Sequence, residues 1–184
     1  MNIFYLDHDP KNAAIFHCDR HVNKMIIELA QIMSINHRFL DGITIKNGRS
    51  VTYLMEDPQM EEVLYKVNRL HLYHPSTKWN RLSIDNYKWT FELFKELCNE
   101  YQYRYGKIHS VWIRFKDVLI NPPNNLSEGK LTKPNYAFSG LKECIVDDPV
   151  ESYRNYYVTK RHKFNMKWTG RATPSWFIDR IHEE

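Results

Sequence analysis

Apolar residues recur every three or four positions along most of the chain, and this spacing predicts a mainly α-helical protein. In the first predicted helix, at about residues 10–38, Val22, Met25 and Leu29 follow it. Further helices are predicted at about residues 58–72, 84–105, 108–119 and 149–164, with a short last one beginning at Pro174. We therefore expect about five helices in a single compact domain that spans residues 1–184.

Local signals mark the ends of these helices. Asp-Pro pairs begin at Asp9, Asp57 and Asp148, where Asp caps free N–H groups and Pro needs no partner at the first helical position. Gly106 predicts the end of the third helix. The segment at about 121–142 is rich in Pro, Asn, Gly and Ser, so we expect a long loop there.

Strand signals are few. Residues 2–6 form one short candidate strand. The turn pair Asn47-Gly48 predicts at most a small β-hairpin, with residues 43–45 and 50–53 as its arms.

The composition argues against a membrane protein and against a protein stabilised by disulfide bonds. Mean hydropathy is −0.62 and 42% of residues are hydrophobic. No apolar run approaches the ~18 residues of a membrane span. The three cysteines, Cys18, Cys98 and Cys144, are an odd number and widely spaced, which favours a reducing compartment and a cytoplasmic protein.

Charge is segregated along the chain, although the net charge is only +4. The stretches 101–116 and 153–171 interleave Lys and Arg with aromatic residues and contain no acid, and the stretch 65–89 holds five Lys or Arg against Asp85 alone. Phosphates attract basic side chains and bases stack on aromatic rings, so the pattern favours a DNA or nucleotide partner. An ordinary basic face over an aromatic core, or a protein partner, would produce it too.

The first predicted helix carries the densest group of reactive side chains. His17, His21, Lys24 and Glu28 fall within ~60° of one another on its polar side. They are either a solvated face or the acid–base groups of a catalytic cleft. His17 and His21 also have the spacing of a metal pair, but no third ligand is suitably placed, so we expect no metal and no cofactor.

A second group follows the second predicted helix. His74, Lys78 and Trp79 lie in a segment that begins with a His-Pro turn signal and holds Ser and Thr. It is either a plain connection between helices with a packed Trp, or a phosphate contact without the glycines of a P-loop.

Over nearly its whole length the chain resembles a group of largely uncharacterised proteins of tailed phages and large DNA viruses. The resemblance rests on the strings HCDRHVNKM, HPSTKWNRLS, EYQYRYGKIH and DPVESYRNYYVTKRHKFNMKWTGRATPSWF. It implies a viral protein that acts in the cytoplasm of an infected host cell.

The first 110 residues or so are also distantly similar to the pyrimidine-dimer DNA glycosylases. Shared features are Asp19, His21 and Glu28 in order, the His74-Pro75 pair, and an Arg-x-Gly at Arg104. This similarity implies a helical DNA-binding fold in which Glu28 is the catalytic carboxylate. That family attacks with its N-terminal amine after removal of Met1, whereas Asn2 does not favour such removal, so only Glu28 is carried over.

The leading hypothesis is a viral enzyme that acts on a DNA base or nucleotide, such as a DNA base N-glycosylase or a base-modifying enzyme. Glu28 is its general base or stabilises a cationic sugar, His17 or His21 transfers a proton, and Lys24 or Lys78 is a nucleophilic amine or a phosphate contact. The remaining predicted substrate-binding residues are His74, Arg104, Lys107, Arg154, Lys160 and Arg171 for the phosphates, and Trp79, Tyr157 and Trp168 for a flipped base.

Two alternatives remain open at this point. The first is a non-catalytic protein that binds nucleic acid or a nucleotide, for example to sequester a defence signal. The second is a module that binds a host protein through its Tyr, Trp and Arg side chains. The sequence does not indicate an oligomeric state.

Overall fold

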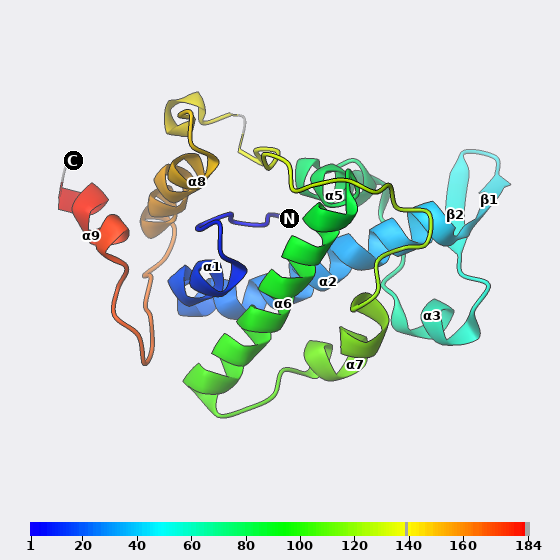
Figure 1. The fold of residues 1–184 in the computed structure, drawn as a ribbon, viewed down its shortest axis with the longest axis horizontal. Helices are drawn as coiled ribbons and strands as arrows, with labels where there is room; N and C mark the ends of the chain where they lie inside the picture. The colour runs from blue at the N-terminus through cyan, green and yellow to red at the C-terminus, as the bar shows by residue number, and fades with distance from the viewer. Residues whose placement is uncertain (139, 183–184) are drawn as a thin grey trace.

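The structure, a computed structural model, describes residues 1–138 and 140–182. These residues form nine α-helices, two short 3₁₀ helices and one two-stranded antiparallel hairpin (Figure 1). The helices are α1 (Pro10–Phe16), α2 (Asp19–Asp41), α3 (Pro58–Val63), α4 (Arg69–Leu72), α5 (Pro75–Asn80), α6 (Ile84–Tyr105), α7 (Ser110–Leu119), α8 (Pro149–Val158) and α9 (Ser175–His182). The 3₁₀ helices are η1 (Lys142–Cys144) and η2 (Thr159–His162), and the strands are β1 (Ile43–Asn47) and β2 (Ser50–Leu54).

The predicted helical class and the hairpin are confirmed, but the expected number of five helices is wrong. The first predicted helix divides into α1 and α2, because His17 and Cys18 both adopt extended backbone angles. The second predicted helix divides into α3 and α4 after Leu64, whose backbone is also extended. Within the predicted 74–79 connection, His74 caps α5 by accepting the Ser76 N–H, and Pro75 occupies its first position.

Two other boundaries differ from the expectation. The last long helix, α8, ends at Val158 and continues as η2 rather than as α-helix. Residues 2–6 form no strand, because Phe4 has a positive φ of 49° and no second strand pairs with the segment among the described residues. The long loop at about 121–142 is present apart from residue 139, which lies outside the described residues.

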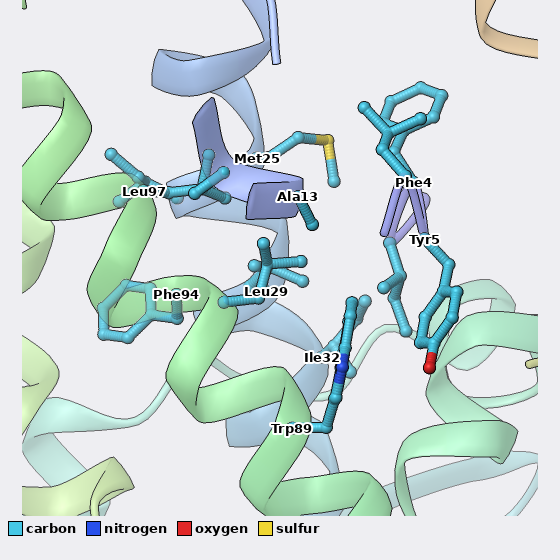
Figure 2. Packing of buried hydrophobic residues seen from close by; sticks show 14 of the residues in the cluster. Phe4, Tyr5, Ala13, Met25, Leu29, Ile32, Trp89, Phe94 and Leu97 are labelled. Carbon is cyan, nitrogen blue, oxygen red and sulfur yellow. The ribbon is translucent and has the colours of Figure 1, made fainter. Parts of the chain in front are cut away.

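The core forms where α2 crosses α6 and α1 packs on α6 (Figure 1). Met25 and Leu29 of α2 meet Leu97 and Phe94 of α6 in this region, with Ala13 of α1 beside them (Figure 2). All five side chains are buried. The polar side of α2, which carries Lys24 and Glu28, meets the N-terminal segment through the bond from the Asn2 N–H to Glu28.

The N-terminal segment lies between α8 and α5 (Figure 1). The Asn2 side chain accepts the N–H groups of Ile3 and Phe4, at 2.8 and 2.9 Å. Phe4 then turns through its positive φ, and residues 3–6 are buried. A non-glycine residue at positive φ costs free energy and persists only where its surroundings hold it, and here the buried packing of residues 3–6 holds Phe4.

Among the described residues, no helix has the length and apolar character needed to cross a membrane.

Candidate active site

A cleft of about 390 Å³ opens between α2, the N-terminal segment and the end of α8 with η2. Its lining combines one carboxylate with four basic side chains, one histidine and three aromatic rings. The lining residues are Met1, Asn2, Phe4, Arg20, His21, Lys24, Glu28, Ala137, Tyr156, Lys160, Lys163 and Phe164. Three of the four predicted catalytic residues, Glu28, His21 and Lys24, therefore lie around one concave site.

A second cleft of similar size, about 420 Å³, lies between α6 and α7. It contains none of the predicted site residues. Its acidic and basic groups are partly paired with one another, as in the ion pairs Lys95–Glu92 and Lys116–Asp117. The first cleft is the better candidate because it brings together three of the predicted catalytic residues and the shielded carboxylate of Glu28.

Glu28 is held from two sides. Its Oε1 lies 3.2 Å from the Lys24 Nζ, and its Oε2 accepts the Asn2 N–H at 3.0 Å. The side chain is only 13% exposed, whereas that of Lys24 is 56% exposed. Glu28 is thus a shielded and oriented carboxylate rather than part of a solvated surface pair.

His21 is built into the wall of the cleft as a neutral side chain. The Tyr157 hydroxyl accepts the Cys18 N–H at 2.9 Å and forms a second hydrogen bond with the His21 Nδ1, 2.8 Å away. Burial, together with the nearby His17, Lys24, Lys160 and Arg20, lowers the pKa of His21 to about 3. At neutral pH His21 is a hydrogen-bond donor and not a cation.

His74 is a partly buried histidine at the start of α5. Its Nδ1 accepts the Ser76 N–H at 3.2 Å, which caps α5. Partial burial, and then the positive charge of the Met1 amino group, lower the pKa of His74 to about 4, against the opposing effect of Glu28. The electrostatic influence of both groups places His74 near the carboxylate, although it does not line the cleft.

Three further cations surround the cleft. Arg20 stacks over the Phe164 ring at 4.6 Å from the centroid, and the Lys160 Nζ lies 3.6 Å above the Tyr156 ring. Lys163 is exposed at the rim. Burial and the neighbouring Lys163 and Lys24 lower the pKa of Lys160 to about 8. The site therefore combines a positive field with an amine that loses its proton more easily than usual.

The predicted base-stacking residues do not face the cleft. Trp79, Tyr157 and Trp168 are at most 7% exposed. The indole N–H groups of Trp79 and Trp168 donate to backbone carbonyls, at 3.2 and 2.9 Å. The three rings are core residues. The aromatic rings of the cleft belong to Phe4, Tyr156 and Phe164 instead.

His17 is also part of the core, because the helix breaks between it and His21. Its Nδ1 donates to the Ala13 carbonyl at 2.6 Å, and its Nε2 is buried without a partner among the described residues. Burial lowers the pKa of His17 to about 4. The expectation that His17 shares a helix face with His21 is wrong.

Three of the predicted phosphate-binding arginines are engaged in internal ion pairs. Arg104 pairs with Glu100 and Asp19, at 2.8 and 2.9 Å, and Arg171 pairs with Glu100 at 2.9 Å. Arg154 pairs with Asp7 at 3.2 Å and with Glu151 at 3.0 Å. The other two predicted basic residues outside the cleft, Lys78 and Lys107, are exposed.

Eight lining residues were not predicted: Met1, Asn2, Phe4, Arg20, Ala137, Tyr156, Lys163 and Phe164. Three of them belong to the basic and aromatic stretch 153–171. This pattern indicated the region of the site, but it did not show which of its residues line the cleft. Arg20 is next to the predicted His21 in the sequence, whereas no sequence feature marked Phe4 as a site residue.

No group of three His, Cys, Asp or Glu side chains within the described part of the chain is placed to hold a metal ion. The site's chemical inventory thus consists of a shielded carboxylate, a neutral imidazole N–H, amines and a guanidinium. These groups suit a substrate that carries phosphate and develops positive charge during the reaction.

Comparison of this chain with protein-family models, curated proteins and solved structures finds no match.

Proposed function

We propose that the cleft around Glu28 is the active site of an enzyme that removes a base from DNA, a DNA base N-glycosylase. The observation that carries the proposal is the position of Glu28, a shielded carboxylate surrounded by cations in one concave site. Breaking the bond between a base and deoxyribose places positive charge on the sugar, and an oriented carboxylate stabilises that charge or activates the attacking group.

The remaining lining residues supply the other requirements of this reaction. Arg20, Lys24 and Lys163 offer positive charge to the phosphates on either side of the target nucleotide. A target base has to leave the stack, and Phe4, Tyr156 and Phe164 provide aromatic surface in the cleft.

The neutral His21 is suited to the departing base. In the proposed tautomer the Tyr157 hydroxyl donates to Nδ1, so the neutral ring carries its proton on Nε2 and donates a hydrogen bond from there without adding a charge. Negative charge collects on the base as the bond breaks, and a donor placed there stabilises it. We extend the proposal to a viral enzyme in an infected cell, on the resemblance to phage and large-virus proteins.

The test is base release by Glu28→Gln beside the wild-type protein. The substrates are duplex oligonucleotides that each contain one damaged or modified base, ultraviolet-induced pyrimidine dimers included. Gln keeps the shape and the bond from the Asn2 N–H but removes the charge, so we expect a loss of about 100- to 10,000-fold in rate. The DNA affinity should not fall.

Glu128→Gln is the matched control, because Glu128 is exposed and lies outside the cleft. Its rate should equal that of the wild-type protein. DNA binding without base release, equal in all three proteins, would contradict the enzyme and favour a non-catalytic binding protein.

A further inference from the structure

The cleft contains several amines, and their surroundings differ. Lys24 is committed to an ion pair with Glu28, at 3.2 Å, and is 56% exposed. Lys163 is exposed to water at the rim. Lys160 is half-buried, and no carboxylate of the described residues lies within ion-pair distance of it. It is therefore the lysine of this cleft least stabilised as an ammonium ion.

We propose that Lys160 is the nucleophile of the cleft and forms a covalent imine with the deoxyribose C1′ of its DNA substrate. The inference rests on the proposed base-removing function and names the group that attacks. The Tyr156 ring holds the Lys160 Nζ, 3.6 Å from the ring centroid, inside the cleft that Glu28 also lines.

The charged and titratable groups around Lys160 come from several elements. Lys24 on α2 and Lys163 after η2 repel its positive charge, as does partial burial, and the Cys144 thiol on η1 acts weakly in the opposite direction. The Tyr156 ring face attracts a cation, so the neutral amine arises from burial and from the two lysines. Their combined effect lowers the pKa of Lys160 to about 8, and a useful fraction of the amine is unprotonated at neutral pH.

The proposed reaction balances with water as the only co-reactant. The Lys160 Nζ lone pair forms a bond to C1′, and the bond from C1′ to the base breaks with both electrons going to the base. The base takes up the proton that the amine releases. The C1′–O4′ bond then opens with both electrons going to O4′, which takes up the remaining proton of the nitrogen, and the nitrogen forms a C=N double bond to C1′. Water adds to this imine and releases the sugar aldehyde and the free amine.

The experiment uses a DNA duplex with one abasic site, whose aldehyde forms the imine directly, together with sodium borohydride. Hydride reduces the C=N bond and fixes the protein to the DNA as a stable secondary amine. We expect a covalent adduct, and mass spectrometry of its peptides should locate the DNA on Lys160. The trapping rate should rise about tenfold per pH unit below pH 8 and level off above it, following the pKa of Lys160.

Two variants make the result specific. Lys160→Arg keeps the positive charge but has no nucleophilic amine, so the adduct should be lost while DNA binding remains. Lys167→Arg is the matched control, because Lys167 is exposed and outside the cleft, and it should trap like the wild-type protein.

An adduct on Lys24 or on the Met1 amino group, or undiminished trapping by Lys160→Arg, overturns the assignment of Lys160. If base release persists under those results, the proposed function stands and only the nucleophile is wrong. If Lys160 traps abasic DNA while no base is released from any tested duplex, the glycosylase proposal fails and Lys160 remains a reactive amine.

Discussion

At the residue scale, the site depends on how each titratable side chain is surrounded rather than on its type. His17 and His21 are both buried on or beside the same helix start. His21 has a tyrosine partner and faces a cleft, whereas His17 has one backbone partner and an unpaired Nε2 in the core. Two residues of one sequence motif therefore have different roles.

The buried histidines predict a loss of stability in mild acid. Burial lowers the pKa of His17 to about 4, while an unfolded histidine titrates near 6.5. Between these values the unfolded chain binds a proton that the native state excludes, so the free energy of unfolding falls as the pH falls through this window. His17 alone should contribute on the order of 1–2 kcal/mol of loss by about pH 5.

Urea unfolding across this pH range checks the effect. His17→Gln removes the titration and leaves an uncharged polar side chain at this position. The slope of unfolding free energy against pH should decrease by up to about 1.4 kcal/mol per pH unit relative to the wild-type protein. The same substitution at the exposed His162 is the control. Parallel slopes for wild type and His17→Gln would rule out this role.

At the element scale, the cleft depends on where helices stop. The break after His17 turns α2 so that its polar side meets the N-terminal segment, and the early end of α8 places Lys160 on η2. At the far end of α6, Gly106 stops the helix in a left-handed conformation, with φ 64° and ψ 19°. Its N–H bonds the Gln102 carbonyl at 2.8 Å.

Gly106 provides a test of this helix end. A Cβ added there would meet no atom within 4 Å, so only the backbone conformation resists a side chain. Gly106→Ala should reduce the free energy of unfolding by about 1 kcal/mol. Gly106→Asn should cost less, since asparagine tolerates the left-handed conformation. Equal costs for Ala and Asn in urea unfolding would contradict the explanation.

At the scale of the whole molecule, a buried ion-pair network joins distant segments. Asp19 begins α2, Glu100 and Arg104 lie near the end of α6, and Arg171 belongs to the chain before α9. The Arg104 side chain is fully buried and also donates to the Ile15 carbonyl at 3.1 Å. The network ties the C-terminal part of the chain to the helices that form the core.

Removal of Arg104 should therefore destabilise the protein strongly. Arg104→Met leaves the buried Glu100 with one fewer partner, and breaking a buried pair in this way costs about 3–5 kcal/mol. Lys95→Met is the matched control on α6, because the Lys95–Glu92 pair is exposed at both ends and is worth about 0–1 kcal/mol. Similar shifts in the denaturant midpoint for Arg104→Met and Lys95→Met would show that the network contributes no more to stability than an exposed ion pair.

The charge of the cleft predicts the salt dependence of DNA binding. If Arg20, Lys24 and Lys163 each contact a phosphate, log affinity should fall against log salt with a slope of roughly −2 to −3. Arg20→Gln should reduce the magnitude of this slope by about 1. Lys46→Gln, on the exposed hairpin, should leave it unchanged. Fluorescence anisotropy at several salt concentrations measures all three proteins, and a flat salt response would contradict phosphate binding.

The sequence alone determined the local structure well. Helical periodicity, the Asp-Pro starts, the Gly106 stop and the Asn47-Gly48 turn depend on neighbouring residues, so α6, α7 and the hairpin lie close to where they were predicted. Sequence order also brought His21, Lys24 and Glu28 together, since one helical turn separates each from the next.

Only the tertiary structure decided which side chains are available to contact a substrate. Glu100 and Arg104 have the i,i+4 spacing of an ion pair within one helix. Nothing in the sequence shows that Arg171 also pairs with Glu100 or that Arg104 reaches Asp19, because these partners come from separate segments. The same is true of the aromatic residues: Tyr156 lines the cleft and Tyr157 is buried, although they are adjacent in one helix. The exposure of these side chains and the ion pairs between separate segments are set by long-range contacts, which a local sequence pattern does not reveal.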